Sequence, residues 1–240
     1  MGVDGLTLSP NERSLIVAVL NRFDRRKRGA SRLIVSCDEL YSLLTPEQGE
    51  IVRRVVGIDP YGLGFRGPFI GLTEPPDNLV LVRGQEFAPG ADGARQRIAP
   101  QYVSRTVLAA FRKMNRALRR ETAGRTLLIE SGYRSPAYQA VVFLRSLAFQ
   151  HDFDFRETLK CVALPGYSEH GRPQKQALDL ATPLGSSVSG DGPDFSTTRE
   201  YAWLLKNACR FWFVLSYMRG NPYGIAYEPW HWRYFGPRHA

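Results

Sequence analysis

Residues 176–181, with the sequence QALDLA, form the stretch that decides the fold of this chain. Successive side chains of a β-strand point to opposite faces, so Leu178 and Leu180 lie on one face and Asp179 lies on the other. The neighbours on the Asp179 face are alanines, and their small side chains leave room for an ion beside the carboxylate. The stretch therefore predicts a strand that presents a carboxylate on its more open face.

Working outward from this strand, further strand and helix patterns intermix without a regular order. Apolar runs predict strands at residues 78–83, 126–129, 211–217 and 225–232. A helix is predicted over residues 104–120, where apolar side chains recur at helical spacing: Val107, Leu108, Phe111, Met114 and Leu118. The absence of βαβ repeats and Gly-rich crossover turns favours an α+β fold with a mostly antiparallel central sheet flanked by helices.

Four short motifs predict where other helices begin. Residues 9–12 (SPNE) place a serine cap before a proline and a glutamate, and residues 45–47 (TPE) start a second helix in the same way. Ser135 is the predicted cap of a helix that runs to about Phe149. Residues 197–200 (TTRE) match a capping box.

Two regions are expected along the chain. Residues 1–78 form an N-terminal accessory region, helical and rich in loops, and residues 79–240 form the main domain. The 240 residues are 43% hydrophobic, enough for one well-buried core. No apolar run approaches the roughly 20 residues that span a bilayer. The early run at residues 15–20 (LIVAVL) lacks the flanks of a signal peptide, so neither a membrane span nor a leader is expected.

The charge of the chain limits the kinds of partner it could bind, and its cysteines limit the kinds of thiol chemistry it could perform. The net charge of +9 includes basic clusters at residues 22–32 and 112–125. Such clusters suit nucleic acid, anionic lipid or acidic cell-wall polymer, or they are solvated helix faces. No zinc-finger or RNP-like motif accompanies them, so no specific nucleic-acid partner is expected. Cys37, Cys161 and Cys209 show no CxxC spacing, which argues against thiolate zinc binding and thioredoxin chemistry.

Two segments far apart in the chain together supply the ligands of a catalytic zinc ion. His170, Asp179 and His231 offer two imidazoles and a carboxylate, and a zinc enzyme uses three such ligands plus an open position for water. Glu228 is a spare carboxylate that can move protons as the general base. Since Glu228 and His231 are three residues apart, a flat strand would point them to opposite faces. A bend at Pro229-Trp230 is therefore needed.

At these residues the sequence resembles the zinc D-alanyl-D-alanine carboxypeptidases of the vancomycin-resistance type, which are related to L,D-carboxypeptidases, phage cell-wall endopeptidases, lysostaphin-type peptidases and the hedgehog domain. The resemblance runs from about residue 78 to residue 236. It is carried, in order along the chain, by SGYRS at 131–135 with Gln139, PGYSEH at 165–170, ALD at 177–179, Trp203-Leu204, Asn207-Ala208, Ser216-Tyr217 and YEPWHWRY at 227–234.

The resemblance implies a role for each candidate residue. One Zn²⁺ per chain would be held by His170, Asp179 and His231, with Glu228 as catalytic base. Arg134 would bind a substrate carboxylate or carbonyl oxygen and help stabilise the oxyanion, which suits a rigid bidentate guanidinium. Three further residues would bind substrate: Gln139 and Ser168 by hydrogen bonds to the terminal carboxylate, and Trp230 by shaping the site.

The chain departs from the family at one place. Asp179 follows His170 by nine residues instead of the usual seven, and Lys175 stands where the family has a glycine. We interpret residues 171–176 (GRPQKQ) as a two-residue loop insertion that keeps both ligands.

The sequence thus predicts a zinc peptidase that cuts peptidoglycan stem peptides, with D-alanyl-D-alanine as the favoured scissile bond. The alternatives are an L,D-carboxypeptidase, a cell-wall endopeptidase, or a non-catalytic zinc-containing module that binds cell wall or a partner. The expected partners are stem peptides, and a monomer is the default. The expected location is the periplasm or cell envelope if a leader has been removed, and otherwise the cytoplasm.

Overall fold

The computed structural model describes residues 7–89, 93–185 and 192–237. The chain divides into two compact units. The helical unit comprises Met1–Pro75, Ser135–Gly171 and Pro222–Ala226, and the sheet unit comprises Pro76–Arg134, Arg172–Asn221 and Tyr227–Ala240. The predicted boundary between residues 78 and 79 stays a prediction.

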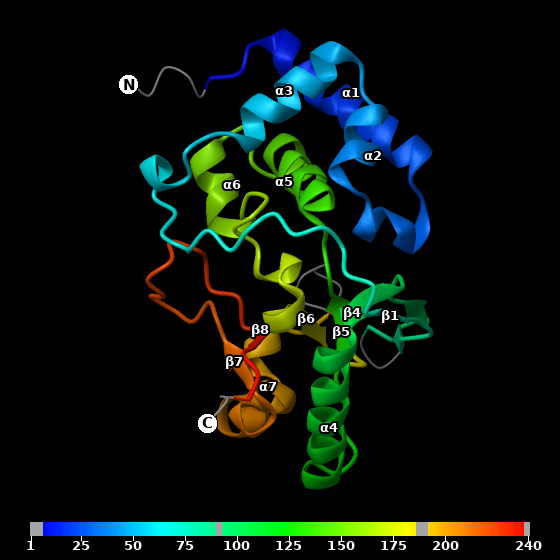
Figure 1. The fold of residues 1–240 in the computed structure, drawn as a ribbon. Coiled ribbons are helices and arrows are strands. Elements are labelled where there is room, and N and C mark those ends of the chain that lie inside the picture. The colour runs from blue at the N-terminus through cyan, green and yellow to red at the C-terminus, as the bar shows by residue number, and fades with distance from the viewer. Residues whose placement is uncertain (1–6, 90–92, 186–191, 238–240) are drawn as a thin grey trace. The chain divides into compact units, whose positions relative to one another are not determined.

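The helical unit is built around one apolar helix, α5 (Pro136–Phe149). Because apolar side chains surround α5 on nearly every side, it occupies the centre and packs against α1, α2, α3 and α6. Figure 1 shows these helices, whose bounds are α1 Pro10–Arg26, α2 Cys37–Ser42, α3 Pro46–Val56 and α6 Phe155–Cys161. Segments of 3₁₀ helix lie at Gly29–Ile34, Tyr61–Leu63 and Glu169–Gly171.

The predicted helix starts of this unit are confirmed. Ser9 and Thr45 each form a complete capping box at the start of α1 and α3. The Ser135 hydroxyl accepts from the Tyr138 backbone N–H, and α5 ends at Phe149 as expected. These starts could be predicted because a cap is a local interaction within three residues of the chain.

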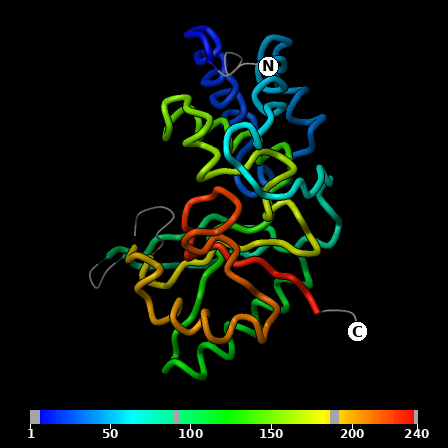
Figure 2. The backbone as a smooth tube through the Cα atoms, turned by 90° about the vertical axis from the view of Figure 1, so that its left-hand side faces the viewer, coloured from blue at the N-terminus to red at the C-terminus, as the bar shows by residue number. Residues whose placement is uncertain are grey.

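The sheet unit contains a four-stranded antiparallel sheet in the order β5-β6-β8-β7. Its strands are β5 Leu128–Ser131, β6 Ala177–Ala181, β7 Phe213–Leu215 and β8 His231–Tyr234. In Figure 2 they appear in green, yellow, orange and red. Two small antiparallel pairs accompany the sheet: β1 (Leu79–Val82) with β4 (Gln101–Ser104), and β2 (Glu86–Phe87) with β3 (Gln96–Arg97). The predicted α+β class is confirmed.

Helices α4 (Arg105–Glu121) and α7 (Arg199–Asn207) supply the rest of the core of this unit. Met114 and Leu118 of α4 are fully buried in the same apolar cluster as Leu178 and Leu180 of β6. The leucine face of QALDLA is therefore a core face. The 3₁₀ turns of this unit are Pro173–Lys175, Phe195–Thr197 and Ala208–Phe211. Among the described residues, no helix combines the length and apolar character needed to cross a membrane.

The predicted strand at residues 225–232 is wrong over most of its length. Of residues 225–232, only His231 and Trp232 belong to β8, and Pro229-Trp230 form a turn. Ala226, which precedes that turn, bonds instead to helix α6, since its N–H donates to the Lys160 carbonyl at 2.7 Å. A proline also removes one ladder donor, which makes a continued strand unfavourable.

Two smaller expectations also need correction in the sheet unit. The predicted strand at 211–217 is cut to three residues, because Trp212 adopts a left-handed conformation with φ of 68° and is 38% exposed rather than in the core. Helix α7 begins one residue later than the capping-box pattern implied. Its cap is Thr198, whose hydroxyl accepts from the Tyr201 N–H, while the Thr197 hydroxyl donates to the Asp194 carbonyl.

Candidate metal centre

Asp179 and His231 occupy directly opposite positions on the neighbouring strands β6 and β8. Residues opposite each other in an antiparallel pair project to the same face, so the carboxylate and the imidazole meet. Asp179 Oδ1 lies 3.0 Å from His231 Nδ1, and both side chains are less than a tenth exposed. The strand register alone thus creates a buried pair of candidate metal ligands.

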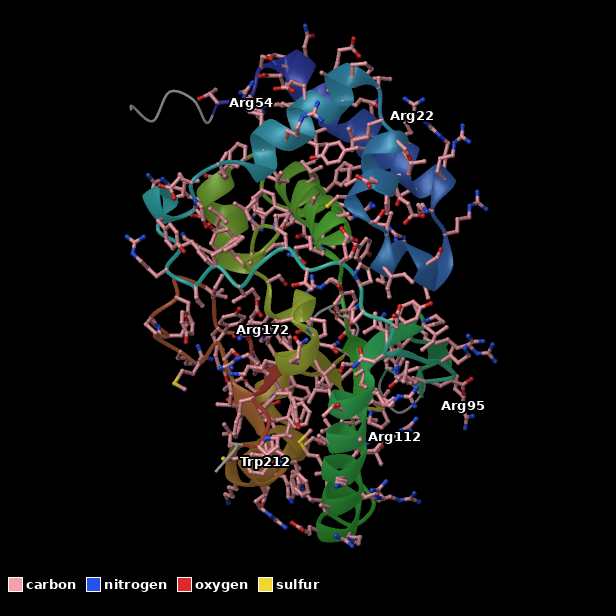
Figure 3. The ribbon with its side chains drawn as sticks, in the orientation of Figure 1. Arg22, Arg54, Arg95, Arg112, Arg172 and Trp212 are labelled. Carbon is pink, nitrogen blue, oxygen red and sulfur yellow. The ribbon has the colours of Figure 1, made fainter. Side chains whose placement is uncertain are left out.

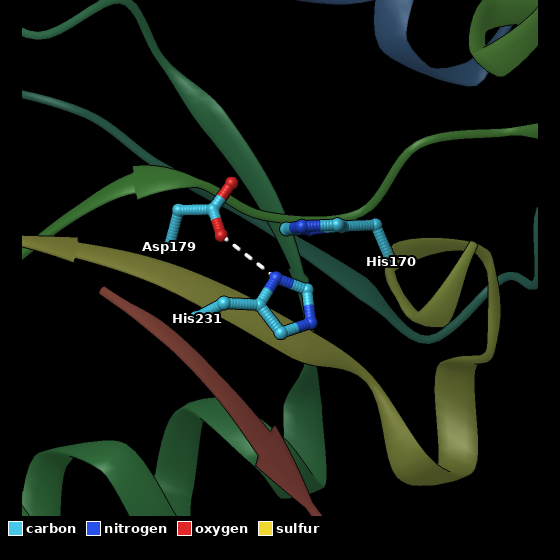
Figure 4. A group of neighbouring side chains, drawn as sticks. All are labelled: His170, Asp179 and His231. Carbon is cyan, nitrogen blue, oxygen red and sulfur yellow. Dashed lines mark hydrogen bonds and ion pairs between the residues drawn. The ribbon is translucent and has the colours of Figure 1, made fainter. Parts of the chain in front are cut away.

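His170 completes a group of three candidate ligands. It lies in the 3₁₀ turn Glu169–Gly171, is 1% exposed, and offers a ligand atom within 4.8 Å of those of Asp179 and His231 (Figure 4). Two imidazole nitrogens and one carboxylate oxygen, buried and close together, are the donor set of a zinc site with an open fourth position. By the chemistry of these donors, the residues fit zinc.

The bend that the sequence analysis required is present just before β8. Pro229 and Trp230 form a turn closed by the His231 N–H, which donates to the Glu228 carbonyl at 3.1 Å. The turn brings Glu228 Oε2 to 3.6 Å from His231 Nδ1. The Glu228 N–H donates to the Tyr217 carbonyl at 3.0 Å, so the backbone of the glutamate is held at a defined place beside the imidazole.

Tyr217 has a place at this centre that the sequence analysis did not assign. Its ring lies against the His231 imidazole with a centroid distance of 4.5 Å and an angle of 34° between the planes. Such ring contacts limit the rotation of an imidazole. The Ser216-Tyr217 dipeptide was part of the resemblance, but only the pairing of β7 with β8 reveals what its ring contacts.

Arg134 approaches the same pair from the loop after β5. Its Nη2 lies 3.8 Å from Asp179 Oδ2, its side chain is 16% exposed, and its Nε is buried without a hydrogen-bond partner among the described residues. A buried N–H of this kind is costly unless a ligand accepts from it. The arrangement suits the binding of an oxyanion.

Strand β4 holds the loop that carries Arg134. The Gly132 N–H donates to Gln101 Oε1 at 3.2 Å, and the Tyr133 N–H donates to the Tyr102 carbonyl at 2.6 Å. A Cβ atom on Gly132 would lie 2.2 Å from that carbonyl oxygen, so the backbone approaches too closely for any side chain. The glycine of SGYRS is therefore a packing requirement for the position of Arg134.

The other residues predicted to bind substrate have these places in the structure. In the helical unit, Gln139 is 2% exposed and its Nε2 donates to the Ala163 carbonyl at 2.6 Å, while its buried Oε1 has no partner in the described ranges. Ser168 is 8% exposed, and its carbonyl accepts from the Gly171 N–H. In the sheet unit, Trp230 is half-buried against the apolar core. Their roles toward substrate stay predictions.

The segment between His170 and Asp179, interpreted above as carrying a two-residue insertion, includes a short 3₁₀ turn at Pro173–Lys175. Gln176, at its end, is fully buried and ties the segment to two strands. Its Oε1 accepts from the Ser104 N–H at 2.9 Å, and its carbonyl accepts from the Tyr234 N–H at 3.1 Å. Lys175, in the place of the family glycine, is exposed. The added residues are thus accommodated without displacing Asp179 from the sheet.

An antiparallel sheet beside a buried His-Asp-His group provides a scaffold that could hold a metal ion. The family model of the VanY D-alanyl-D-alanine carboxypeptidases matches residues 100–237, more than half of the chain. The chain belongs to this family, and the resemblance noted in the sequence is confirmed.

Individual relatives agree with this assignment. YodJ of Bacillus subtilis (strain 168) is 31% identical over 186 residues, which cover 70% of this chain and 64% of YodJ. A D-alanyl-D-alanine carboxypeptidase of Enterococcus faecium is 31% identical over 143 residues, covering 58% of this chain and 39% of the enzyme. The chain thus spans less than two thirds of the length of these relatives.

The chain also resembles the solved structure of LdcB, an LD-carboxypeptidase that was studied for its recognition of peptidoglycan. The two structures align with a TM-score of 0.50. The alignment has 26% identity and covers 70% of this chain and 72% of that one.

Proposed function

We propose that this protein is a zinc-dependent carboxypeptidase that removes the terminal D-alanine from peptidoglycan stem peptides ending in D-alanyl-D-alanine. Membership of the VanY family supports the reaction, and the group of His170, Asp179 and His231, with ligand atoms within 4.8 Å of one another, carries the zinc dependence. One Zn²⁺ per chain is proposed, because three protein ligands with an open position are the usual inventory of a catalytic site.

In the proposed hydrolysis, residues of the chain hold the metal ion and transfer protons. When bound, zinc supplies Lewis acidity that activates water and polarises the scissile carbonyl. Glu228 takes a proton from the attacking water and returns it to the leaving amine as the C–N bond breaks. Its position 3.6 Å from His231 supports this role.

Arg134 is proposed to bind the oxygen atoms of the substrate. Its charge beside Asp179 and its buried, unpartnered Nε favour a carboxylate or the developing oxyanion. Gln139, Ser168 and Trp230 are proposed to complete recognition of the peptide. We also propose action in the envelope or on cytoplasmic stem peptides, as a monomer.

A second candidate is an L,D-carboxypeptidase, which acts on the tetrapeptide stem. The structural likeness to LdcB favours it. A cell-wall endopeptidase and a non-catalytic zinc-containing binding module are the further alternatives, and the proton-transfer position of Glu228 argues for catalysis.

The test is release of D-alanine from a pentapeptide stem by zinc-loaded protein. Glu228→Ala should lower the rate by about 10²–10⁴-fold. Glu169→Ala, which removes the carboxylate next to His170, is the matched control and should keep its activity. Release of D-alanine from the tetrapeptide stem and not from the pentapeptide would instead indicate an L,D-carboxypeptidase. Cleavage only of cross-linked muropeptides would indicate an endopeptidase, and zinc binding with no cleavage would indicate a binding module.

A further inference from the structure

Five of the eleven arginines of the helical unit form ion pairs with acidic side chains. Asp24 of α1 pairs with both Arg32 and Arg145, at 3.0 and 2.9 Å. Further pairs in this unit are Arg13 with Asp152, Arg53 with Glu50, and Arg54 with Glu12.

Arg22, Arg25 and Arg26 form a cluster of arginines that line one recess of the surface. They lie on one side of α1, and within the described ranges none of them has an acidic partner within ion-pair distance. Arginine stays protonated in proteins, so three guanidinium groups brought together repel one another and cannot relieve the repulsion by losing a proton.

These three arginines surround a recess in the surface. Its volume is about 310 Å³, and its other lining residues are Ala18, Asn21 and Gln48. Ligand pockets in proteins have volumes of roughly 300–1,000 Å³, so the recess has room for a small polar group. Arg22, labelled in Figure 3, is half-buried there, and its Nη1 donates to Gln48 Oε1 at 3.2 Å.

Helix α3 borders this recess through Gln48, and its first turn also carries the exposed Glu47. Gln48 belongs to the first turn of α3, a helix of 11 residues, and is only 8% exposed. The start of a helix carries a partial positive charge and favours anions. Gln48 also accepts from the Thr45 N–H, so its amide is held in place and fixes Arg22 at the edge of the recess.

We propose that the recess of Arg22, Arg25 and Arg26 is a binding site for the phosphate groups of an anionic phosphodiester polymer. Phosphate matches guanidinium groups in charge and in bidentate geometry. Insertion of α1 into a membrane surface would call for exposed apolar side chains beside the charges. The exposed large hydrophobic residues of the described chain lie elsewhere than on α1 and α3. For a cell-wall peptidase, such a site would keep the enzyme close to a wall polymer that carries phosphate.

The proposal is tested by fluorescence anisotropy of the full chain with a labelled poly(glycerol phosphate) oligomer. The variant R22Q/R25Q/R26Q should bind roughly tenfold more weakly or worse, because three charge-assisted contacts are lost. R112Q/R116Q/R119Q removes three exposed arginines of α4 and the same charge, and should change the affinity by less than about twofold. Inorganic phosphate should compete with the oligomer for the wild-type protein.

A further variant separates binding from folding. R25Q/R26Q keeps the bond from Arg22 to Gln48 and should still lose most of the affinity, with an unchanged melting temperature. Equal losses of affinity in the two triple variants would overturn the proposal, because the binding would then depend on the net charge of the protein and not on the recess. It would also fail if the polymer did not bind, or if only phosphatidylglycerol vesicles bound. Because binding is read without hydrolysis, a failure here leaves the proposed peptidase reaction untouched.

Discussion

Asp179 and His231 are 52 residues apart in the chain, yet they are cross-strand partners with Oδ1 and Nδ1 separated by 3.0 Å. In this arrangement the carboxylate and the imidazole are positioned by backbone hydrogen bonds of the sheet rather than by flexible loops. A site built on sheet strands is pre-organised, because the ligands lose little freedom when an ion binds.

Replacing Asp179 by Asn should remove zinc from the protein. The amide has nearly the shape of the carboxylate but carries no charge and is a weak zinc ligand. We expect a loss of zinc affinity of at least about 100-fold, since even partners outside the ligand set cost 10–100-fold. Competition with a chromogenic chelator measures the affinity. Glu228→Gln is the control and should retain zinc, and equal loss in both variants would contradict the assigned ligands.

Tyr217 should affect metal affinity through its ring. Tyr217→Leu removes the ring that lies 4.5 Å from the His231 imidazole, whereas Tyr217→Phe keeps it. An aromatic pair contributes about 0.5–1.5 kcal/mol beyond its buried area, so the leucine variant should bind zinc about 2- to 10-fold more weakly. The phenylalanine variant should lose less. The same chelator titration distinguishes them, and an equal loss in both would assign the effect to the hydroxyl instead.

Substitution of Gly132 should destabilise the protein. A Cβ at this position would lie 2.2 Å from a backbone carbonyl that cannot move without disturbing β4. Gly132→Ala should therefore lower the free energy of unfolding by about 1–3 kcal/mol, the usual range for overpacking.

Gly49 provides the matched control for Gly132. It lies within α3, where a Cβ would meet no atom closer than 3.6 Å. Gly49→Ala should raise the unfolding free energy by about 0.5–1 kcal/mol, because alanine favours a helix. Urea denaturation of both variants measures these changes, and stabilisation by both would show that β4 yields to the methyl group.

The stability of the sheet unit should depend on Trp203 at acidic pH. The hydrogen bond from Trp203 Nε1, together with that from Arg210, holds the pKa of the Glu121 carboxyl below its usual value of 4.5. A group with a lowered pKa in the folded state stabilises the protein above the unfolded pKa, and the contribution is lost as the pH falls through the folded value.

In the Trp203→Phe variant, the free energy of unfolding should therefore fall less steeply than in the wild type as the pH is lowered below 4.5. The measurement is the free energy of unfolding of wild type and variant as the pH is lowered from neutrality. A difference between the two proteins that stays constant through the acid range would mean that the substitution acts through packing alone.

Much of the fold could be predicted from local patterns. The starts of α1, α3 and α5 depend on caps that lie within three residues of the helix, and the apolar face of α4 repeats with helical period. The strand at residues 225–232 could not be located this way. An apolar segment forms a strand only where a partner strand is available, and the Ala226 N–H bonds instead to the Lys160 carbonyl of the helical unit.

The chemically active side chains of the candidate site could be predicted from the sequence. The residues that hold those side chains in position could not. The sequence contains the imidazoles and carboxylates of the candidate zinc site at His170, Asp179, Glu228 and His231. Nothing near these residues indicates that Gln101 and Tyr102 of β4 hold the loop of Arg134, since they bond to Gly132 and Tyr133 some thirty residues along the chain.

The sequence by itself determined the kinds of side chain that the site can use, the helix caps, and the alternation that sends Asp179 away from the leucine core. These are properties of single residues or of neighbours along the chain. The tertiary structure decided that Asp179 faces His231 and that the ring of Tyr217 lies on that imidazole. The physical reason is that strand register follows from the cooperative packing of an entire sheet face, and a slip by one residue would turn every side chain of the strand to the other face.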